Sequence, residues 1–245
     1  MLRLSFFASF GLLLTGTIVA AGEGPDIHYN SLGRRTLEIG DTLSLPLGKG
    51  EAEYRRVLEC DLTLQILGHH DRQRTDRLTA LSDITGEVFD VLKFQNPLSW
   101  PMTTAPAMVT EQSRFLGQSQ SGWVNPQQIA SVKITKVMNA SVTCFETMEM
   151  IEPIATQKFF DRPYFKRPVS QTIEIVNRRN EEVTLQLNGC YLGNTEKIEP
   201  KPTKRTLSAR SFFPNVLNDL FWELTLKPGE SKTITLTGTR WVNWN

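Results

Sequence analysis

Hydrophobic and polar residues alternate with a period of two along most of the chain. Near the C-terminus the apolar positions of this pattern are Trp222, Leu224, Leu226, Ile234 and Leu236, with polar residues between them. This period is typical of strands with one buried face, because successive side chains point to opposite faces. Such segments recur at spacings of roughly ten residues, and helical periodicity is nearly absent. The pattern predicts an all-β fold built from antiparallel β-sandwiches, with very little helix.

Turn-forming residues separate the alternating segments. Lys-Pro-Gly-Glu at 227–230 predicts a type II turn, since proline presets φ at the second position and Gly229 accepts a positive φ at the third. Residues 177–180, Asn-Arg-Arg-Asn, predict a hairpin between two alternating segments. Residues 54–67 form the longest alternating stretch, which predicts the longest strand.

Residues 159–168, FFDRPYFKRP, are rich in aromatic residues and proline. A segment of this kind between two alternating regions is typical of an ordered linker. We therefore expect two immunoglobulin-like sandwich domains in tandem, comprising residues 22–162 and 163–245.

Residues 1–21 have the pattern of a secretory signal peptide. Arg3 precedes an uncharged apolar run, and the small side chains of Val19 and Ala21 stand directly before Gly22. The alternative is an uncleaved membrane anchor, which serine and threonine residues within the run disfavour. The pattern predicts cleavage after Ala21 and a periplasmic or secreted protein without a membrane span.

The charge balance argues against nucleic acid as a partner. Removal of residues 1–21 takes away Arg3 and leaves 26 basic residues against 26 acidic ones. Proteins that bind nucleic acids usually carry a clear excess of basic residues. No nucleic acid partner is therefore expected.

The chain contains three cysteines, Cys60, Cys144 and Cys190. An odd number in an exported chain leaves at least one thiol without an intramolecular partner, so a disulfide scaffold is not expected. Cys60 is in phase with apolar neighbours and is expected in the core. One disulfide bond between two of these cysteines remains an alternative, because the sequence does not show which two would pair.

Three segments together resemble a known family: VLKFQNPLSWPMTTAPAMVTEQSRFLGQ, TIEIVNRRNEEVTLQLN and FWELTLKPGESKTITL. Residues 86–241 resemble the C-terminal domain of mucoidy inhibitor A-like proteins, a domain of unknown function. The resemblance lies in the order of these segments, with a strand end at Asn96, a second strand end at Gly117, and the Ile-x-x-x-Asn motif formed by Ile173 and Asn177. The resemblance implies an exported β-sandwich protein of the bacterial envelope with a reduced N-terminal part. It implies no catalytic residue and no ligand.

Candidate metal ligands are few. His69, His70 and Asp71 are adjacent, and His28 is the remaining histidine. Zinc requires three or four convergent ligands, whereas adjacent residues of a strand point to opposite faces. We expect a solvated loop, and neither a metal site nor a cofactor.

Catalytic motifs are equally sparse. No G-x-S-x-G motif is present, and Cys144 near Glu146 is a weak candidate nucleophile without an identified base. A pair of acidic residues able to cleave a glycosidic bond can be neither located nor excluded. The alternative function is therefore an exported hydrolase acting on cell-wall material.

Aromatic residues near turns and chain ends provide the candidate binding surface, which consists of Trp100, Trp123, Tyr164, Trp241 and Trp244. Exposed aromatic rings bind sugars and protein partners. The competing interpretation is that these rings are buried and cover the ends of the sandwiches or the joint between them. The main prediction is an exported, non-enzymatic envelope protein that binds a protein or glycan partner.

The spacing near the C-terminus raises one further question. Arg240 is in phase with the apolar positions of its strand, whereas Trp241 is not. A β-bulge at Gly238 would change the faces of the strand to which the side chains of Arg240 and Trp241 point.

Overall fold

The structure, a computed structural model, describes residues 2–10, 43–67, 84–149, 153–208 and 214–243. Nearly all of the regular structure in the described chain is β-strand, which confirms the all-β part of the predicted fold class. The strands are β1 Leu2–Phe10, β2 Leu43–Ala52, β3 Tyr54–Asp61, β4 Ile84–Gly86, β5 Val88–Gln95, β6 Pro106–Glu111, β7 Arg114–Gln120, β8 Ile129–Lys136, β9 Ala140–Met148, β10 Ala155–Phe159, β11 Arg162–Asn177, β12 Val183–Leu192, β13 Asn194–Glu199, β14 Lys204–Ser208, β15 Leu217–Leu226 and β16 Ser231–Val242.

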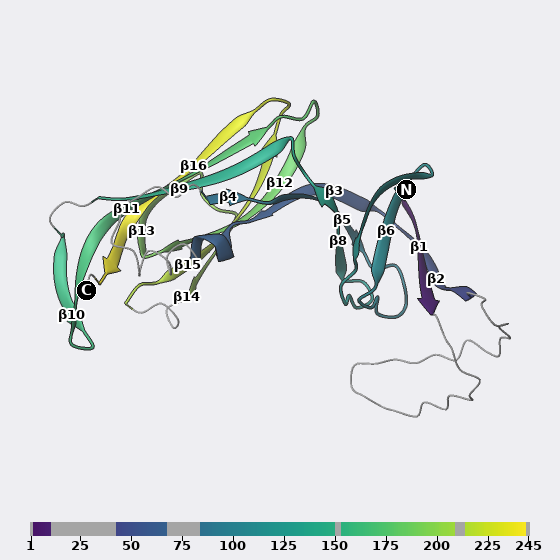
Figure 1. Cartoon of the computed structure of the whole chain (residues 1–245), viewed down its shortest axis with the longest axis horizontal. Coiled ribbons are helices and arrows are strands. Elements are labelled where there is room, and N and C mark those ends of the chain that lie inside the picture. The colour runs from purple at the N-terminus through teal and green to yellow at the C-terminus, as the bar shows by residue number, and fades with distance from the viewer. Residues whose placement is uncertain (1, 11–42, 68–83, 150–152, 209–213, 244–245) are drawn as a thin grey trace.

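Two six-stranded sheets form a β-sandwich (Figure 1). The first sheet has the order β13-β16-β11-β9-β4, with β10 paired to β11, and the second has the order β14-β15-β12-β3-β5-β8. Neighbouring strands are antiparallel except β12 and β3, which run parallel. Apolar residues of both sheets, among them Trp222, Leu187, Ile173, Ile234 and Cys144, are fully buried between them.

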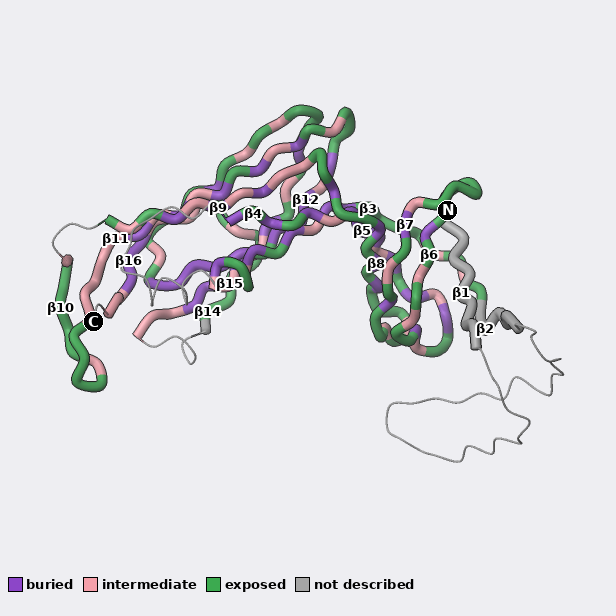
Figure 2. The backbone as a smooth tube through the Cα atoms, in the orientation of Figure 1, coloured by how far each residue is buried: buried purple, intermediate pink, exposed green. Residues whose placement is uncertain are grey.

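A smaller lobe extends from one end of the sandwich (Figures 1 and 2). Its separate apolar core includes Leu92, Phe94, Met102 and Val132, and it is covered by the β6–β7 hairpin. Gly117 of β7 lies so close to β8 that an added Cβ would stand 2.2 Å from the carbonyl oxygen of Ile134. Glycine therefore allows the hairpin to close over this second core.

The expected division into tandem immunoglobulin-like units at 162/163 is not confirmed. Both six-stranded sheets contain strands from each side of that position. The segment expected to be a linker, residues 159–168, instead ends β10 and begins β11, which continues without a break for 16 residues. One sandwich core is thus assembled from both halves of the sequence.

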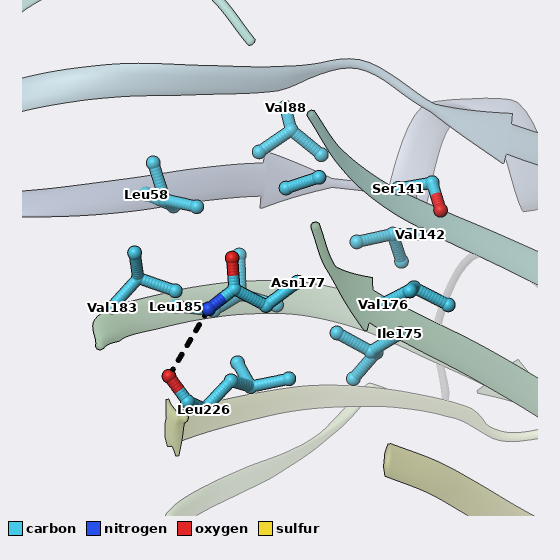
Figure 3. A pocket seen from close by; sticks show the side chains of 11 residues that line it. Leu58, Val88, Ser141, Val142, Ile175, Val176, Asn177, Val183, Leu185 and Leu226 are labelled. Atoms are coloured by element: carbon cyan, nitrogen blue, oxygen red, sulfur yellow. Dashed lines mark hydrogen bonds between the residues drawn. The ribbon is translucent and has the colours of Figure 1, made fainter. Parts of the chain in front are cut away.

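The hairpin predicted at 177–180 is wrong, because β11 and β12 belong to different sheets. The connection is a corner organised by Asn177, whose Nδ2 donates to the carbonyl of Lys227 at 2.9 Å and whose Oδ1 accepts from the N–H of Arg179 at 3.0 Å. A further bond from Nδ2 to Leu226 is drawn in Figure 3. The hollow beside it measures about 10 Å³, which is barely space for one water molecule.

The turn at 227–230 forms as predicted. Gly229 has a φ of 70°, and the N–H of Glu230 donates to the carbonyl of Lys227 at 3.1 Å. These are the features of a type II turn, here joining the two sheets.

The strand predicted at 54–67 is shorter than expected. It ends at Asp61, and residues 63–67 form a helical turn. The Oδ1 atom of Asp61 accepts from the N–H of Thr63 at 2.8 Å, which forms an Asx-turn at the end of the strand. The helical turn leaves Leu64 82% exposed while Leu62 and Ile66 remain in the core.

The predicted signal peptide overlaps β1, which pairs only with β2 among the described strands. Residues 11–21 lie outside the described residues. Cleavage after Ala21 would remove β1 and leave both six-stranded sheets intact, so the fold is compatible with the predicted processing.

Gly193, between β12 and β13, provides a direct test of this packing. Its φ is +128°, and an added Cβ would lie 2.3 Å from the carbonyl oxygen of Thr239. Gly193→Ala is expected to lower the free energy of unfolding by about 2 kcal/mol, measured by urea denaturation. Gly122→Ala is the matched control, since its Cβ would meet nothing within 4 Å. Equal stability of the two variants would contradict the prediction.

Candidate functional site

The structure divides the five predicted aromatic residues into two groups. Tyr164 and Trp241 lie on β11 and β16 of the sandwich, whereas Trp100 and Trp123 lie on loops of the smaller lobe. These two regions are at opposite ends of the molecule in Figure 1. Trp244 lies outside the described residues.

Tyr164 and Trp241 join Phe159 in a cluster that we call the aromatic platform. The Phe159 ring contacts both others edge-to-face, with centroids 5.3 Å from Tyr164 and 5.5 Å from Trp241. Such arrangements are favourable for aromatic pairs. Each ring is half-buried, so the platform is neither a core cluster nor a fully exposed patch.

Strand register places the aromatic platform on the outer face of the sandwich. Trp241 is opposite Lys166 on β11, and its neighbour Arg240 points into the core. Tyr164, two residues before Lys166, shares this outer face, and Phe159 reaches it from β10. The Nδ2 and Oδ1 atoms of Asn215 bind the carbonyl and N–H of Trp241, each at 2.8 Å, and fix the end of β16.

Two cations flank the aromatic platform. Arg162 is opposite Phe159, and Lys166 is opposite Trp241, so both belong to the same face. Within the described chain neither forms an ion pair with a carboxylate. The face therefore combines aromatic rings with two positive charges that are available to a ligand.

The turn between β10 and β11 is strained. Phe160 and Asp161 have φ values of 52° and 60°, the left-handed conformation that a two-residue type I′ turn requires. Asn-Gly is preferred there, and a bulky residue with positive φ is an outlier. Phe160 is nevertheless 83% exposed. The sequence Phe-Asp gave no hairpin signal, which explains why this hairpin was predicted as a linker.

The loops that carry Trp100 and Trp123 are joined by the side chain of Asn96. The buried Asn96 donates from Nδ2 to the carbonyls of Trp100 and Val124, at 3.1 and 3.0 Å, and so joins their loops. Trp100 is 41% and Trp123 45% exposed. The Trp123 indole donates to Asn125 Oδ1 at 3.2 Å. These two indoles lie on connected loops of the smaller lobe, away from the aromatic platform (Figure 1).

Sequence reasoning missed a buried ionic cluster inside the sandwich. Arg240 Nη1 and Nη2 donate to the two carboxylate oxygens of Glu146 at 2.6 and 2.8 Å. Gln171 Nε2 also donates to Glu146 at 3.0 Å, and Arg240 Nε donates to the carbonyl of Leu192 at 2.6 Å. Burial alone would lower the pKa of Arg240, but the Glu146 carboxylate raises it, so the guanidinium remains charged.

The in-phase spacing of Arg240 was the only signal for this cluster. No register shift interrupts the pairing of β11 and β16, so Arg240 keeps its inward direction. The bulge expected at Gly238 lies instead on β13, the neighbouring strand of the same sheet, between Thr195 and Lys197. An added Cβ at Gly238 would stand 2.0 Å from the Asn194 carbonyl oxygen, which shows why glycine is needed there.

Cys144 is not placed to act as a nucleophile. It is a free, fully buried thiol, and burial followed by the nearby Glu146 charge raises its pKa to about 12. Cys60 and Cys190 are also free, buried and shifted to about 12, chiefly by burial. Activated cysteines have lowered pKa values and access to substrate. The expected core position of Cys60 is confirmed, and no disulfide forms among the three.

An open polar hollow lies where the smaller lobe meets the sandwich. It measures about 360 Å³ and is lined by Arg56, Asn139, Arg179, Asn180 and Glu181. Arg56 and Arg179 both donate to the carboxylate of Asp90. Arg179 also donates to Glu181 at 3.0 Å. Its cations are neutralised internally, so this hollow is less suited to an anion than the aromatic platform.

The described residues contain no group of three or more His, Cys, Asp or Glu able to hold a metal ion. The predicted loop with His69, His70 and Asp71, and also His28, lies outside the described residues. In the described part, none of the helices has the length and apolar character needed to cross a bilayer.

Comparisons with family models, curated proteins and solved structures found no match to this chain. The resemblance to the C-terminal domain of mucoidy inhibitor A-like proteins stays a prediction. What the fold and the site define is an all-β, sandwich-like protein with an aromatic, basic surface at one end.

Proposed function

We propose that this chain is an exported, non-enzymatic binding protein of the bacterial envelope, and that its ligand is an acidic glycan bound on the aromatic platform. The observation that carries the proposal is the grouping of Phe159, Tyr164 and Trp241 with Arg162 and Lys166 on one outer face. Aromatic rings pack against the apolar faces of sugar rings, and cations pair with carboxylate or phosphate groups. The two features together match a negatively charged saccharide.

The arrangement of the backbone supports the same interpretation. The platform rests on hydrogen-bonded strands, with Asn215 fixing the backbone of Trp241, so the rings are positioned before a ligand arrives. Preorganised groups lose less entropy on binding. The buried, high-pKa thiol of Cys144 disfavours the cysteine-dependent form of the alternative, a hydrolase of cell-wall material.

The proposal is tested on an array that presents neutral, carboxylate-bearing and phosphate-bearing bacterial oligosaccharides. The wild-type chain is expected to prefer acidic oligosaccharides, and Tyr164→Ala is expected to weaken binding about tenfold or more, as loss of a central aromatic contact does. Arg162→Ser is expected to reduce the preference for acidic over neutral saccharides, because it removes an exposed cation of the face.

Trp100→Ala is the matched control, since this aromatic residue is exposed but lies in the smaller lobe. It is expected to bind as the wild type does. Circular dichroism verifies that each variant is folded. Absence of glycan binding, loss of binding in Trp100→Ala alone, or release of new reducing ends from the oligosaccharides would each reject the proposal. Retained capture of an envelope protein by Tyr164→Ala would indicate a protein partner bound elsewhere.

A further inference from the structure

β10 forms an open edge of the first sheet. Among the described strands it pairs with β11 alone, from Ala155 opposite Lys166 to Phe159 opposite Arg162. Figures 1 and 2 show it projecting at the end of the sandwich, with nearly every residue exposed. An exposed edge strand presents unpaired main-chain groups to any strand that can align with it.

The register of the hairpin defines which groups point outward. A two-residue turn makes Phe159 and Arg162 a hydrogen-bonded pair, and antiparallel pairs alternate along the ladder. The N–H and C=O groups of Ala155, Gln157 and Phe159 therefore point toward β11. Those of Thr156 and Lys158 point away from it, toward the open edge.

We propose that this edge binds a second copy of the same chain, with β10 pairing antiparallel to β10 of the partner about a two-fold axis at Gln157. In this register Thr156 is opposite Lys158 of the partner subunit, so both outward residues of each copy exchange main-chain hydrogen bonds. Gln157 is opposite its own copy. The inference does not depend on the proposed glycan ligand.

The side chains favour this register over its neighbours. It brings Ile154, 57% exposed, toward Phe160 of the partner subunit, 83% exposed, and so buries two of the largest exposed apolar groups of this end. Shifting the axis to Lys158 would place two lysines opposite each other, which is destabilising. Shifting it to Thr156 would place Lys158 opposite an isoleucine. Of these three registers, only the axis at Gln157 places the exposed Ile154 opposite an apolar residue.

The pairing also has a consequence for the aromatic platform. A two-fold axis perpendicular to the sheet keeps equivalent faces on the same side. The platforms of both copies, each with Phe159, Tyr164 and Trp241, would then lie on one continuous surface. Two linked sites of this kind raise the overall affinity for a repeating ligand without new contacts.

Cysteine substitutions on the full chain test the register. In Gln157→Cys the two thiols are opposite each other in a non-hydrogen-bonded pair, and air oxidation is expected to yield a disulfide-linked dimer. Thr156→Cys and Lys158→Cys are matched controls, because each faces a different residue in the proposed register. The native cysteines are buried and do not compete. Preferential cross-linking of either control, or equal cross-linking of all three, would overturn the proposed register.

Sedimentation velocity over a range of concentrations tests the association itself. The wild type is expected to shift from monomer to dimer, and Thr156→Pro is expected to raise the dimer dissociation constant at least about tenfold, because it removes one outward N–H per copy. The N–H groups that bind β11 are left intact, so the hairpin is preserved. Gln157→Ser is the control expected to leave association nearly unchanged. A wild type that remains monomeric at all concentrations would overturn the proposal, whether or not it binds glycans.

Discussion

Glu146→Leu is expected to lower the free energy of unfolding by about 3–5 kcal/mol, because it leaves the charge of Arg240 buried without its partner. Arg240 is 4% and Glu146 5% exposed, and the two share two hydrogen bonds of 2.6 and 2.8 Å. A guanidinium this deep cannot recover its hydration without opening the sandwich. The midpoint and slope of urea unfolding, followed by tryptophan fluorescence, measure the loss.

The double variant Glu146→Leu/Arg240→Met separates the buried charge from simple loss of packing. Replacing both partners with apolar side chains removes the desolvation cost as well as the attraction, so the double variant is expected to be more stable than Glu146→Leu alone. Glu87→Leu is a surface control, since its ion pair with Lys136 is about half exposed. Its unfolding midpoint is expected to change little. A double variant no more stable than Glu146→Leu would refute the explanation.

Local patterning predicts those strands of this chain that have one solvent-exposed face and one buried face, such as β8 and β16. In β16 the buried Ile234 and Leu236 alternate with exposed Thr233 and Thr235, and this contrast is visible without knowing any partner strand. The type II turn at Gly229 is local as well. Features fixed within a few residues were therefore predictable.

Sheet membership was not predictable in this way. Whether a turn joins neighbours in one sheet or crosses to the other depends on distant strands, such as β3, which pairs parallel with β12. The polar turn after Asn177 has hairpin chemistry yet crosses the sandwich. The domain boundary placed in a local segment is not confirmed for the same reason.

The prolines in the first half of β11 illustrate a second limit of predicting strands from local sequence. Pro163 lies beyond the described pairing of β11 with β16, which begins at Phe165. Pro168 lies at the end of the β9 ladder, where its carbonyl accepts from Glu149 at 3.1 Å. A missing N–H costs little at such positions, so a proline-rich segment forms a strand instead of a linker.

The sequence identified candidate aromatic residues of the site, but it did not show which of them lie together in the fold. Tyr164 and Trp241 are far apart in sequence and meet only through the register of β11 and β16. Phe159 joins them through a hairpin whose turn has no glycine or asparagine. Glu146 and Arg240 likewise meet only through packing. Long-range register, which single-sequence patterns do not contain, decides which aromatic or charged residues become neighbours.

Asp90 forms the other buried ionic cluster, at the joint between the sandwich and the smaller lobe. Its carboxylate is buried and accepts from Arg56 at 2.8 and 2.7 Å and from Arg179 at 3.0 Å. Arg56 comes from the neighbouring strand β3, and Arg179 comes from the corner between β11 and β12. One carboxylate thus connects the shared sheet to that corner.

Asp90→Asn is expected to lower the free energy of unfolding at pH 7 by about 3 kcal/mol, because the side chain of Arg179, 13% exposed, loses its buried carboxylate partner and keeps only the exposed Glu181. Urea denaturation measures the loss. Asp219→Asn is a suitable control, since Asp219 is only half-buried and forms no ion pair within the described chain. It is expected to have a much smaller effect.

The pH dependence of stability identifies the charge as the cause. Burial by itself would raise the pKa of Asp90, but the hydrogen bonds from Arg56 and Arg179 outweigh it, and the folded-state pKa lies below its usual value. The unfolded chain therefore binds this proton at a higher pH than the folded chain does. The stabilisation is fully present above the unfolded-state pKa of about 4 and is lost as the pH falls through the lower folded-state value. The stability difference between wild type and Asp90→Asn should consequently shrink below pH of about 4, and a difference that stays constant from neutral to acidic pH would show that the asparagine acts through shape and not through charge.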